Sequence, residues 1–272
     1  MKIIQLSDLH LRGDGKLSFR VANTPKLVED CFAHLDSLPW QPAAIVITGD
    51  LADSGNVDAY KRLKQFLDRL AVPVYLLPGN HDKRDRMLSI LSEYCPADQS
   101  VAPYFCYTVE HYPMRMVFMD GTRPGSHSGH LDESVAVWLE RELAKAPTVP
   151  TLLFTHHPPF LTGFGRMDEP YENKERLAAI LKHYPNVRLC CGHIHRSITT
   201  QWAGCIALTA PSVAMQIELD LSPTGGDEFR METPGYLLHH FHEGACNSHT
   251  CQIYAQATFS GPHRFYDSVN PK

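Results

Sequence analysis

The amino-acid sequence predicts an α/β fold, in which β-sheets are covered on their outer faces by helices. Short apolar, β-branched runs alternate with amphipathic segments through about two-thirds of the chain, and many of these runs end at Gly, Asp, Asn or His. The pattern changes near Gln216, where turn-rich sequence begins. We therefore expect a main domain over residues 1–215 and a C-terminal β-hairpin appendage over 216–272, which would act as a cap or a dimerisation element.

Each predicted element follows from its own hydrophobic period. Apolar runs bounded by turn residues predict strands over 3–6, 43–48, 72–77, 104–109, 115–119, 151–155, 187–191, 198–202 and 205–208. Apolar residues at helical spacing predict helices over 25–38, 60–70, 133–144 and 177–181, and a further helix beginning near Lys83. In the appendage, two strands are expected over 236–241 and 252–257.

Composition excludes some classes of function. The chain has 272 residues, 43% of them apolar, which is enough to bury a sizeable core. A net charge of −5 argues against sequence-independent binding of a nucleic-acid polymer, which needs a basic face. No signal peptide or membrane span is apparent, so we expect a cytoplasmic protein without membrane contact.

The eight cysteines do not form a dense disulfide framework. Because cytoplasmic cysteines are usually reduced, thiols are the favoured interpretation. Cys246 and Cys251 lie close together near the C-terminus, where a local or intersubunit disulfide is the alternative. A zinc site among the nearby histidines is disfavoured, because their spacing matches no tight Cys-x-x-Cys pattern.

Five predicted strands end in residue types that bind metal ions. The blocks are Asp8-Leu9-His10, Gly49-Asp50, Gly79-Asn80-His81-Asp82, His156-His157 and Gly192-His193-Ile194-His195. Carboxylate, amide and imidazole ligands without thiolates suit divalent Mn, Fe, Co or Zn, and they disfavour a purely structural zinc site. Because ligands gather beyond the carboxyl ends of strands in such folds, we expect the blocks to meet.

The spacing within the blocks suggests how they converge. Residues two apart on an extended segment point to the same side, so Asp8 with His10, and His193 with His195, could each reach one centre. The preceding glycines allow sharp turns and close approach of the backbone. Taken singly, these motifs are usually caps or turns, and it is their joint occurrence at strand ends that indicates a metal centre. We expect His157 to point away from the ligands and to support them.

The series of blocks resembles the calcineurin-like metallophosphoesterase superfamily over roughly residues 2–211. Further blocks at residues 49–55, 129–132, 155–159 and 210–212 are similar to a narrower branch, the class III cyclic nucleotide phosphodiesterases and their glycerophosphodiesterase relatives. The resemblance implies a two-sheet β-sandwich flanked by helices, in the order α, β, β, α.

The resemblance also implies two divalent metal ions, Mn or Fe first, with Zn or Co as alternatives. One ion would be held by Asp8, His10, Asp50 and His195, and the other by Asp50, Asn80, His156 and His193. His81 would face the substrate, stabilising phosphoryl charge or protonating the leaving group. Asp82 would hold the ring of His81 in one tautomer, cap the following helix, or do both.

The implied reaction is hydrolysis of a small phosphodiester, by in-line attack of a hydroxide that bridges the two metals. A 3′,5′-cyclic nucleotide such as cAMP is the favoured substrate, with glycerophosphodiesters or phosphomonoesters as alternatives. A non-catalytic, metal-stabilised binding protein is a further hypothesis, disfavoured because every expected ligand is present. The expected partners are the substrate and, through the appendage, a second copy of the chain.

Overall fold

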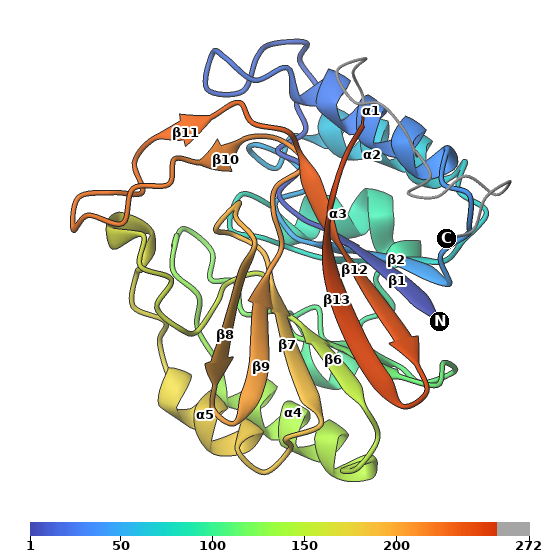
Figure 1. Ribbon diagram of the computed structural model, residues 1–272, viewed down its shortest axis with the longest axis vertical. Helices are drawn as coiled ribbons and strands as arrows, with labels where there is room; N and C mark the ends of the chain where they lie inside the picture. Colours follow the sequence, from blue (N-terminus) through green and yellow to red (C-terminus); the bar gives the residue numbers. More distant parts are fainter. Residues whose placement is uncertain (255–272) are drawn as a thin grey trace, which may run out of the picture.

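The computed structural model describes residues 1–254, and in it two β-sheets pack face to face with helices on both outer sides (Figure 1). The first sheet has the order β13-β12-β1-β2-β3. Its strands are β1 (Lys2–Leu6), β2 (Ala44–Thr48), β3 (Val74–Leu77), β12 (Gly235–His242) and β13 (Ala245–Gln252). The helices beside it are α1 (Thr24–Asp36), α2 (Val57–Leu67) and α3 (Arg84–Leu91).

The second sheet has the order β4-β5-β6-β7-β9-β8. Its strands are β4 (Tyr107–Val109), β5 (Arg115–Phe118), β6 (Thr151–Phe154), β7 (Val187–Cys191), β8 (Ile198–Trp202) and β9 (Cys205–Thr209). It is covered by α4 (Glu133–Lys145) and α5 (Lys174–Leu181). A two-stranded ribbon, β10 (Gln216–Ile217) with β11 (Phe229–Arg230), stands apart from both sheets. The predicted α/β architecture of two sheets flanked by helices is confirmed.

Alternation along each strand divides the core into layers. In β2, Val46 belongs to the apolar layer between the sheets, whereas Ile45 and Ile47 pack against the helices of the first sheet. Phe118 and Phe154 enter the inter-sheet layer from the second sheet. Because β1, β2 and β3 run parallel in register, as do β5, β6 and β7, their carboxyl ends lie at the same edge.

The C-terminal hairpin is the outer edge of the first sheet. Strand β12 pairs antiparallel with β1, from Lys2↔His240 to Gln5↔Leu237, and β13 pairs with β12. Strand β13 begins at residue 245, earlier than the strand expected over 252–257. Residues 255–257 of that expected strand lie outside the described part of the chain. Division of the chain at residue 215 stays a prediction.

Cys246 and Cys251 are free thiols. They lie five positions apart on β13, so their side chains point to opposite faces of the sheet. Cys246 packs against the inter-sheet layer and Cys251 against the helix-covered layer. This arrangement is incompatible with a disulfide between the two, because a disulfide needs Cα atoms about 4.4–6.8 Å apart.

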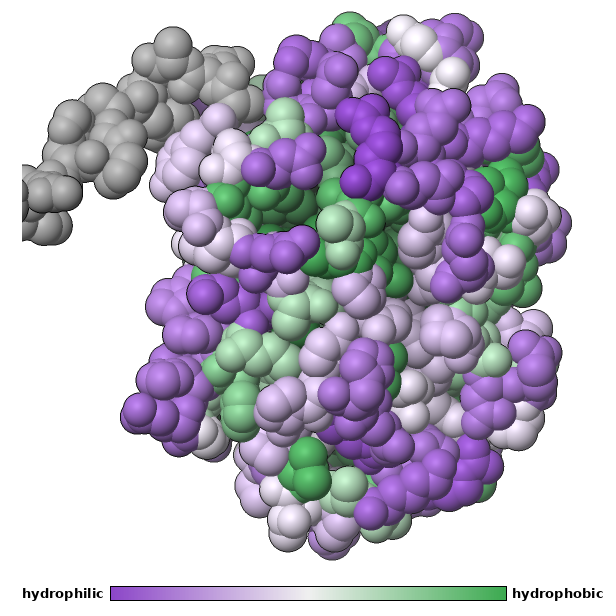
Figure 2. All heavy atoms as spheres, turned by 90° about the vertical axis from the view of Figure 1, so that its right-hand side faces the viewer, coloured by the Kyte–Doolittle hydropathy of each residue, from purple (hydrophilic) through white to green (hydrophobic). Residues whose placement is uncertain are grey.

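The side of the molecule at the right of Figure 1 has a hollow with apolar side chains. It carries a cavity of about 380 Å³ where α1 and α2 end, lined in part by Leu38, Trp40 and Leu70. Figure 2 shows apolar side chains gathered in a hollow in the upper half of this face, within a largely hydrophilic surface. Within residues 1–254, no helix is long and apolar enough to cross a membrane.

Candidate metal centre

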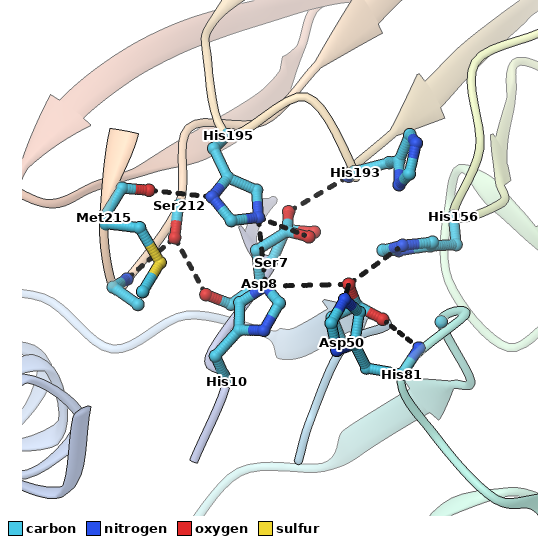
Figure 3. A network of polar contacts seen from close by, with 12 residues as sticks. Ser7, Asp8, His10, Asp50, His81, His156, His193, His195, Ser212 and Met215 are labelled. Atoms are coloured by element: carbon cyan, nitrogen blue, oxygen red, sulfur yellow. Dashed lines mark hydrogen bonds and ion pairs between the residues drawn. The ribbon is translucent and has the colours of Figure 1, made fainter. Parts of the chain in front are cut away.

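The five ligand blocks meet just beyond the carboxyl ends of β1, β2, β3, β6 and β7 (Figure 3). Asp50 lies at the middle of the arrangement and is 2% exposed. Its Oδ2 atom is 3.6 Å from His10 Nε2 and 3.5 Å from His156 Nε2. One carboxylate oxygen thus faces imidazoles from two different strand ends.

One group of potential ligands consists of Asp8, His10 and His195, whose ligand atoms all lie within 4.8 Å of one another. The Nε2 atoms of His10 and His195 are 3.0 Å apart, and His195 Nε2 is 3.4 Å from Asp8 Oδ1. All three side chains are buried. Together with Asp50 they form the first set that the family resemblance implied.

A second group lies on the other side of Asp50. The Nε2 atom of His156 is 3.1 Å from Asn80 Oδ1, and ligand atoms of Asp8, Asp50 and His156 lie within 4.8 Å of one another. His193 joins this side, because its ring is 5.2 Å from that of His156 between centroids. The structure therefore brings together every residue predicted as a metal ligand.

The backbone route to this convergence differs from the extended one predicted. Asp8, His10, Asp50, His193 and His195 all have positive φ, between 42° and 68°, and they make up half of the non-glycine residues with positive φ in residues 1–254. Side chains two apart converge because the loops turn through left-handed conformations, not because a strand continues. Such conformations are costly for non-glycine residues and cluster at functional sites, where the surrounding structure holds them.

The glycines in the blocks allow the close approach predicted for them. Gly49 has φ +95°, and a Cβ atom there would lie 2.5 Å from His156 Nδ1. A Cβ at Gly79 would lie 2.2 Å from Asp50 Oδ1. Any larger side chain at either position would therefore displace a ligand.

Backbone carbonyl groups orient two of the imidazoles. His156 Nδ1 lies 2.7 Å from the Thr48 carbonyl oxygen, and His195 Nδ1 lies 2.9 Å from that of Met215. A carbonyl only accepts, so each Nδ1 carries the proton and donates it. In the neutral ring each Nε2 is then the unprotonated nitrogen, directed at the centre as a metal ligand requires.

The electrostatics of the cluster fit bound cations. Burial alone would raise the pKa of Asp50, but the imidazoles of His156, His81 and His10 outweigh it and hold that pKa well below its usual range. Burial opposes the charged form of His156, yet Asp50 and Asp8 raise its pKa to about 9. The field at His156 Nε2 thus favours positive charge. In addition, Asp8 Oδ1 is buried, and apart from the ion-pair contact with His195 it has no hydrogen-bond partner among the described residues.

His81 is held with one ring nitrogen facing the cluster. Its Nδ1 donates to the Asp53 carbonyl oxygen at 2.7 Å, while its Nε2 lies 4.0 Å from Asp50 Oδ2. Its side chain is 22% exposed, unlike the buried ligands around it. His81 is therefore oriented toward the centre and open to solvent, as expected of a group that contacts substrate.

Asp82 does neither of the two things predicted for it. Its carboxylate accepts hydrogen bonds from the backbone N–H groups of Gly79, Leu51 and Ala52 and from the Tyr60 hydroxyl. The orientation of His81 comes instead from the Asp53 carbonyl, and α3 has Lys83 as its N-cap without a side-chain bond. Asp82 is buried and ties the Asp50 loop to the Asn80 loop, which is a positioning role.

Sequence reasoning missed Asp53 and His127. The Asp53 carboxylate binds Arg12 and Ser18 and lies 3.6 Å from His10 Nδ1. Its position in the block at residues 49–55 was the available signal. His127, on an exposed loop, has its ring 5.7 Å from that of His81 between centroids, and nothing in its sequence context indicates this.

His157 does not point away from the cluster as expected. It is 2% exposed, and its ligand atom groups with those of His156 and His193 within 4.8 Å. Both ring nitrogens are buried. The bend after β6 keeps both histidines on the side of the centre.

A sequence model of the calcineurin-like phosphoesterases matches residues 1–197. The chain belongs to this family. It is 36% identical over 271 residues to a probable glycerophosphodiester phosphodiesterase, GpdQ, of Arcobacter nitrofigilis, covering 98% of this chain and 97% of the relative. It is 31% identical to GpdQ of Enterobacter lignolyticus, covering 88% of this chain and 86% of the relative. Family membership makes the chain a phosphoesterase.

Cyclic nucleotide phosphodiesterases are also among the relatives of this phosphoesterase. The 3′,5′-cyclic adenosine monophosphate phosphodiesterase CpdA of Escherichia coli is 30% identical, with 80% of this chain and 78% of the relative covered. Among solved structures, a putative 5′-nucleotidase from Staphylococcus aureus aligns with a TM-score of 0.53 at 14% identity, covering 98% of this chain and 56% of that one. GAP50 of Plasmodium aligns with a TM-score of 0.57 at 14% identity, covering 93% and 89%. These likenesses show the fold alone.

Proposed function

We propose that this phosphoesterase hydrolyses a small phosphodiester with two divalent metal ions, Mn or Fe first, bridged by Asp50. The observation that carries the proposal is the position of Asp50 Oδ2, within 3.6 Å of His10 Nε2 and 3.5 Å of His156 Nε2, between the two ligand groups. A carboxylate in this position would be able to serve as a ligand to both ions. The two ions would be held by Asp8, His10, Asp50 and His195, and by Asp50, Asn80, His156 and His193.

When bound, such ions supply an activated water and neutralise charge on the phosphoryl oxygens. The protein supplies orientation and proton transfer. With Nδ1 committed to the Asp53 carbonyl, His81 presents Nε2 to the centre, where it can donate a hydrogen bond to a phosphoryl oxygen or a proton to the leaving oxygen. Asp82 fixes the loop that carries His81 and Asn80.

Glycerophosphodiesters are the substrates we propose, in place of the cyclic nucleotides favoured by sequence alone. The support is the extent of similarity: the GpdQ relative of Arcobacter matches 98% of this chain at higher identity than CpdA of E. coli, which matches 80%. Cyclic nucleotide hydrolysis is the second candidate, favoured by the CpdA relative.

A cavity of about 550 Å³ begins at Gly79 and Asn80, beside the proposed centre. It continues between α3 and the segments 97–105 and 122–125, with Leu88, Pro103 and Tyr104 among its apolar walls. A mostly apolar cavity of this size is typical of small-ligand sites. It offers room for one alcohol group of a diester whose phosphorus lies at the centre.

The test uses metal-stripped protein with Mn²⁺ added back. Hydrolysis of glycerophosphoethanolamine, cAMP, bis(p-nitrophenyl) phosphate and p-nitrophenyl phosphate is measured for the wild type and for Asn80→Ala and His81→Ala. We expect Mn²⁺-dependent cleavage of diesters over the monoester, with glycerophosphoethanolamine ahead of cAMP in kcat/KM. Both variants should lose at least about 10²-fold in kcat.

Each part of the proposal can fail separately. A higher kcat/KM for cAMP would replace the substrate and keep the centre. A preference for the monoester would make the chain a phosphatase. Absence of hydrolysis in protein that binds two metals would favour the non-catalytic alternative.

A further inference from the structure

A chain of polar side chains crosses the otherwise apolar layer between the two sheets. It consists of Gln5 on β1, Thr48 on β2, and His239 and Ser248 on the C-terminal hairpin. Gln5, Thr48 and His239 are each fully buried, at 0% exposure. Polar groups in such a layer are retained when fully satisfied networks fix one arrangement of the surrounding structure. Nothing in the mechanism described above uses Gln5, Ser248 or His239.

The donors and acceptors in this chain can be assigned without ambiguity. Gln5 Nε2 lies 3.0 Å from the Cys191 carbonyl oxygen, which only accepts, and 3.1 Å from Thr48 Oγ1. Gln5 Oε1 must therefore accept the bond from His239 Nε2, at 3.0 Å. His239 Nδ1 then accepts from Ser248 Oγ at 2.7 Å, and Ser248 Oγ accepts from Arg188 at 2.6 Å. Every donor points in one direction along the chain.

The far end of the chain reaches three strands that carry metal ligands. Gln5 itself is three residues before Asp8. Thr48, two residues before Asp50, donates from Oγ1 to the Leu6 carbonyl at 3.2 Å, and its own carbonyl accepts the Nδ1 proton of His156. Cys191, whose carbonyl Gln5 also binds, is two residues before His193. A single amide therefore links the ends of β1, β2 and β7 across the two sheets, two or three residues before the ligands that follow these strands.

We propose that Gln5 is a positioning residue for the metal ligands, and that His239 of the C-terminal hairpin orients its amide. With His239 donating to Oε1, the amide nitrogen faces Thr48 and Cys191, and the spacing between the two sheets at the ligand-bearing edge is set. Without that bond the Gln5 amide can flip or tilt. Thr48 Oγ1 then loses the hydrogen bond that Gln5 Nε2 donates to it, and Thr48 is the residue whose carbonyl orients His156. The C-terminal hairpin thus contributes to the metal centre through contacts with β1 rather than by supplying a ligand.

The test measures Mn²⁺ affinity directly, with catalysis as a second readout. Metal-stripped wild type, Gln5→Leu, His239→Leu and His239→Gln are titrated with Mn²⁺, and free Mn²⁺ is followed by electron paramagnetic resonance well below the unfolding temperature. Gln5→Leu and His239→Leu should weaken Mn²⁺ binding by about tenfold, the lower range for groups that support metal ligands. His239→Gln, which retains an N–H donor, should recover most of the affinity. The kcat for bis(p-nitrophenyl) phosphate should fall in the same order.

A matched control separates positioning from stability. Met116 is fully buried in the same inter-sheet layer, on β5, and has no part in the polar chain. Met116→Ala should lower the unfolding temperature without changing the Mn²⁺ dissociation constant. The inference is overturned if Gln5→Leu and both His239 variants bind Mn²⁺ like the wild type, whatever their unfolding temperatures.

If Gln5→Leu does not fold, the contrast between His239→Leu and His239→Gln decides by itself, and equal Mn²⁺ affinities of these two overturn the inference. Because the inference rests on the proposed centre, failure of the wild type to bind Mn²⁺ would overturn both. Normal wild-type binding with unaffected variants would overturn the inference alone.

Discussion

The ligand-bearing edge of the two sheets and the layer between the sheets lie a few residues apart along the chain, yet they differ in backbone conformation and in the polarity of their side chains. At the edge, five ligand residues adopt left-handed conformations, and buried carboxylates crowd against imidazoles. Between the sheets, Met116, Phe118 and Phe154 pack in regular strands without strain. The comparison teaches that unstrained packing is found in the layer, while the edge holds backbone conformations that are costly for residues other than glycine, as functional sites often do.

Replacing Asp50 gives the sharpest test of this contrast. Asp50→Asn keeps the shape and an oxygen for the His81 N–H, which Asp50 Oδ1 now accepts at 2.9 Å. It removes the carboxylate charge that we propose is shared by the two ions, so Mn²⁺-dependent hydrolysis should fall by about 10³-fold or more. The metal-stripped variant should unfold in urea at the same concentration as the wild type or higher. If this variant lost stability and kept its activity, the ligand-bearing edge would be a source of stability and Asp50 would not be needed for hydrolysis.

Met116→Ala should show the reverse pattern. A buried Met→Ala change leaves a cavity and costs about 2–5 kcal/mol in the free energy of unfolding. The measurement is urea denaturation, beside kcat of the folded protein, which should stay within about twofold because Met116 lies outside the ligand network. A large drop in kcat at full folding would show that the layer and the edge are coupled more tightly than this contrast allows.

Metal addition should stabilise the edge by mass action. At a free Mn²⁺ concentration about 100 times the dissociation constant, the free energy of unfolding should rise by about 2.7 kcal/mol for each site that fills. Thermal denaturation with and without Mn²⁺ checks this, and Asp50→Asn serves as the control that should not respond. An equal response in both proteins would place the bound metal elsewhere.

Acid should lower the free energy of unfolding through protonation of His239, which lies in the inter-sheet layer. Burial first, and then the charge of Arg188, lower the pKa of His239 from 6.5 to about 3. The unfolded chain binds this proton between those values and the folded chain does not, so stability is lost as pH falls below about 6.5. A fall from about pH 6.5 to about pH 5 should remove about 2 kcal/mol. Urea denaturation of the wild type and His239→Gln at both pH values measures the difference. An equal change in the free energy of unfolding of the two proteins between these pH values would contradict the prediction.

Sequence patterns predicted the strands that carry ligands, because each apolar run stops where a metal-binding block begins. Strands β7 and β8 have the predicted bounds, and the other predicted strands differ by a few residues at their ends, except β13, which begins seven residues before the strand expected over 252–257. The convergence of Asp8 with His10 was predicted from an extended backbone, whereas both residues have positive φ. The sequence does not reveal this, because residues other than glycine usually avoid positive φ values.

The misreadings share one physical origin, contacts between residues distant in sequence. Asp82 was assigned to its neighbours, whereas two of its bonds reach the backbone of Leu51 and Ala52, about thirty residues away. Strand β13 reads Ala-Cys-Asn-Ser-His-Thr-Cys-Gln, a mostly polar pattern with little strand signal. Its pairing with β12, and that of β12 with β1, is fixed by the assembled sheet.

The pairing of β12 with β1 has a consequence for synthesis of the protein. A ribosome releases β1 early, but its antiparallel neighbour follows more than two hundred residues later. Until then one edge of β1 keeps its backbone N–H and C=O groups open to other chains, a known route to aggregation. Closure comes with β12, and β13 then presents Asn247, His249 and Thr250 as a polar border. Premature termination before β12 should therefore yield a chain that depends on chaperones to stay in solution.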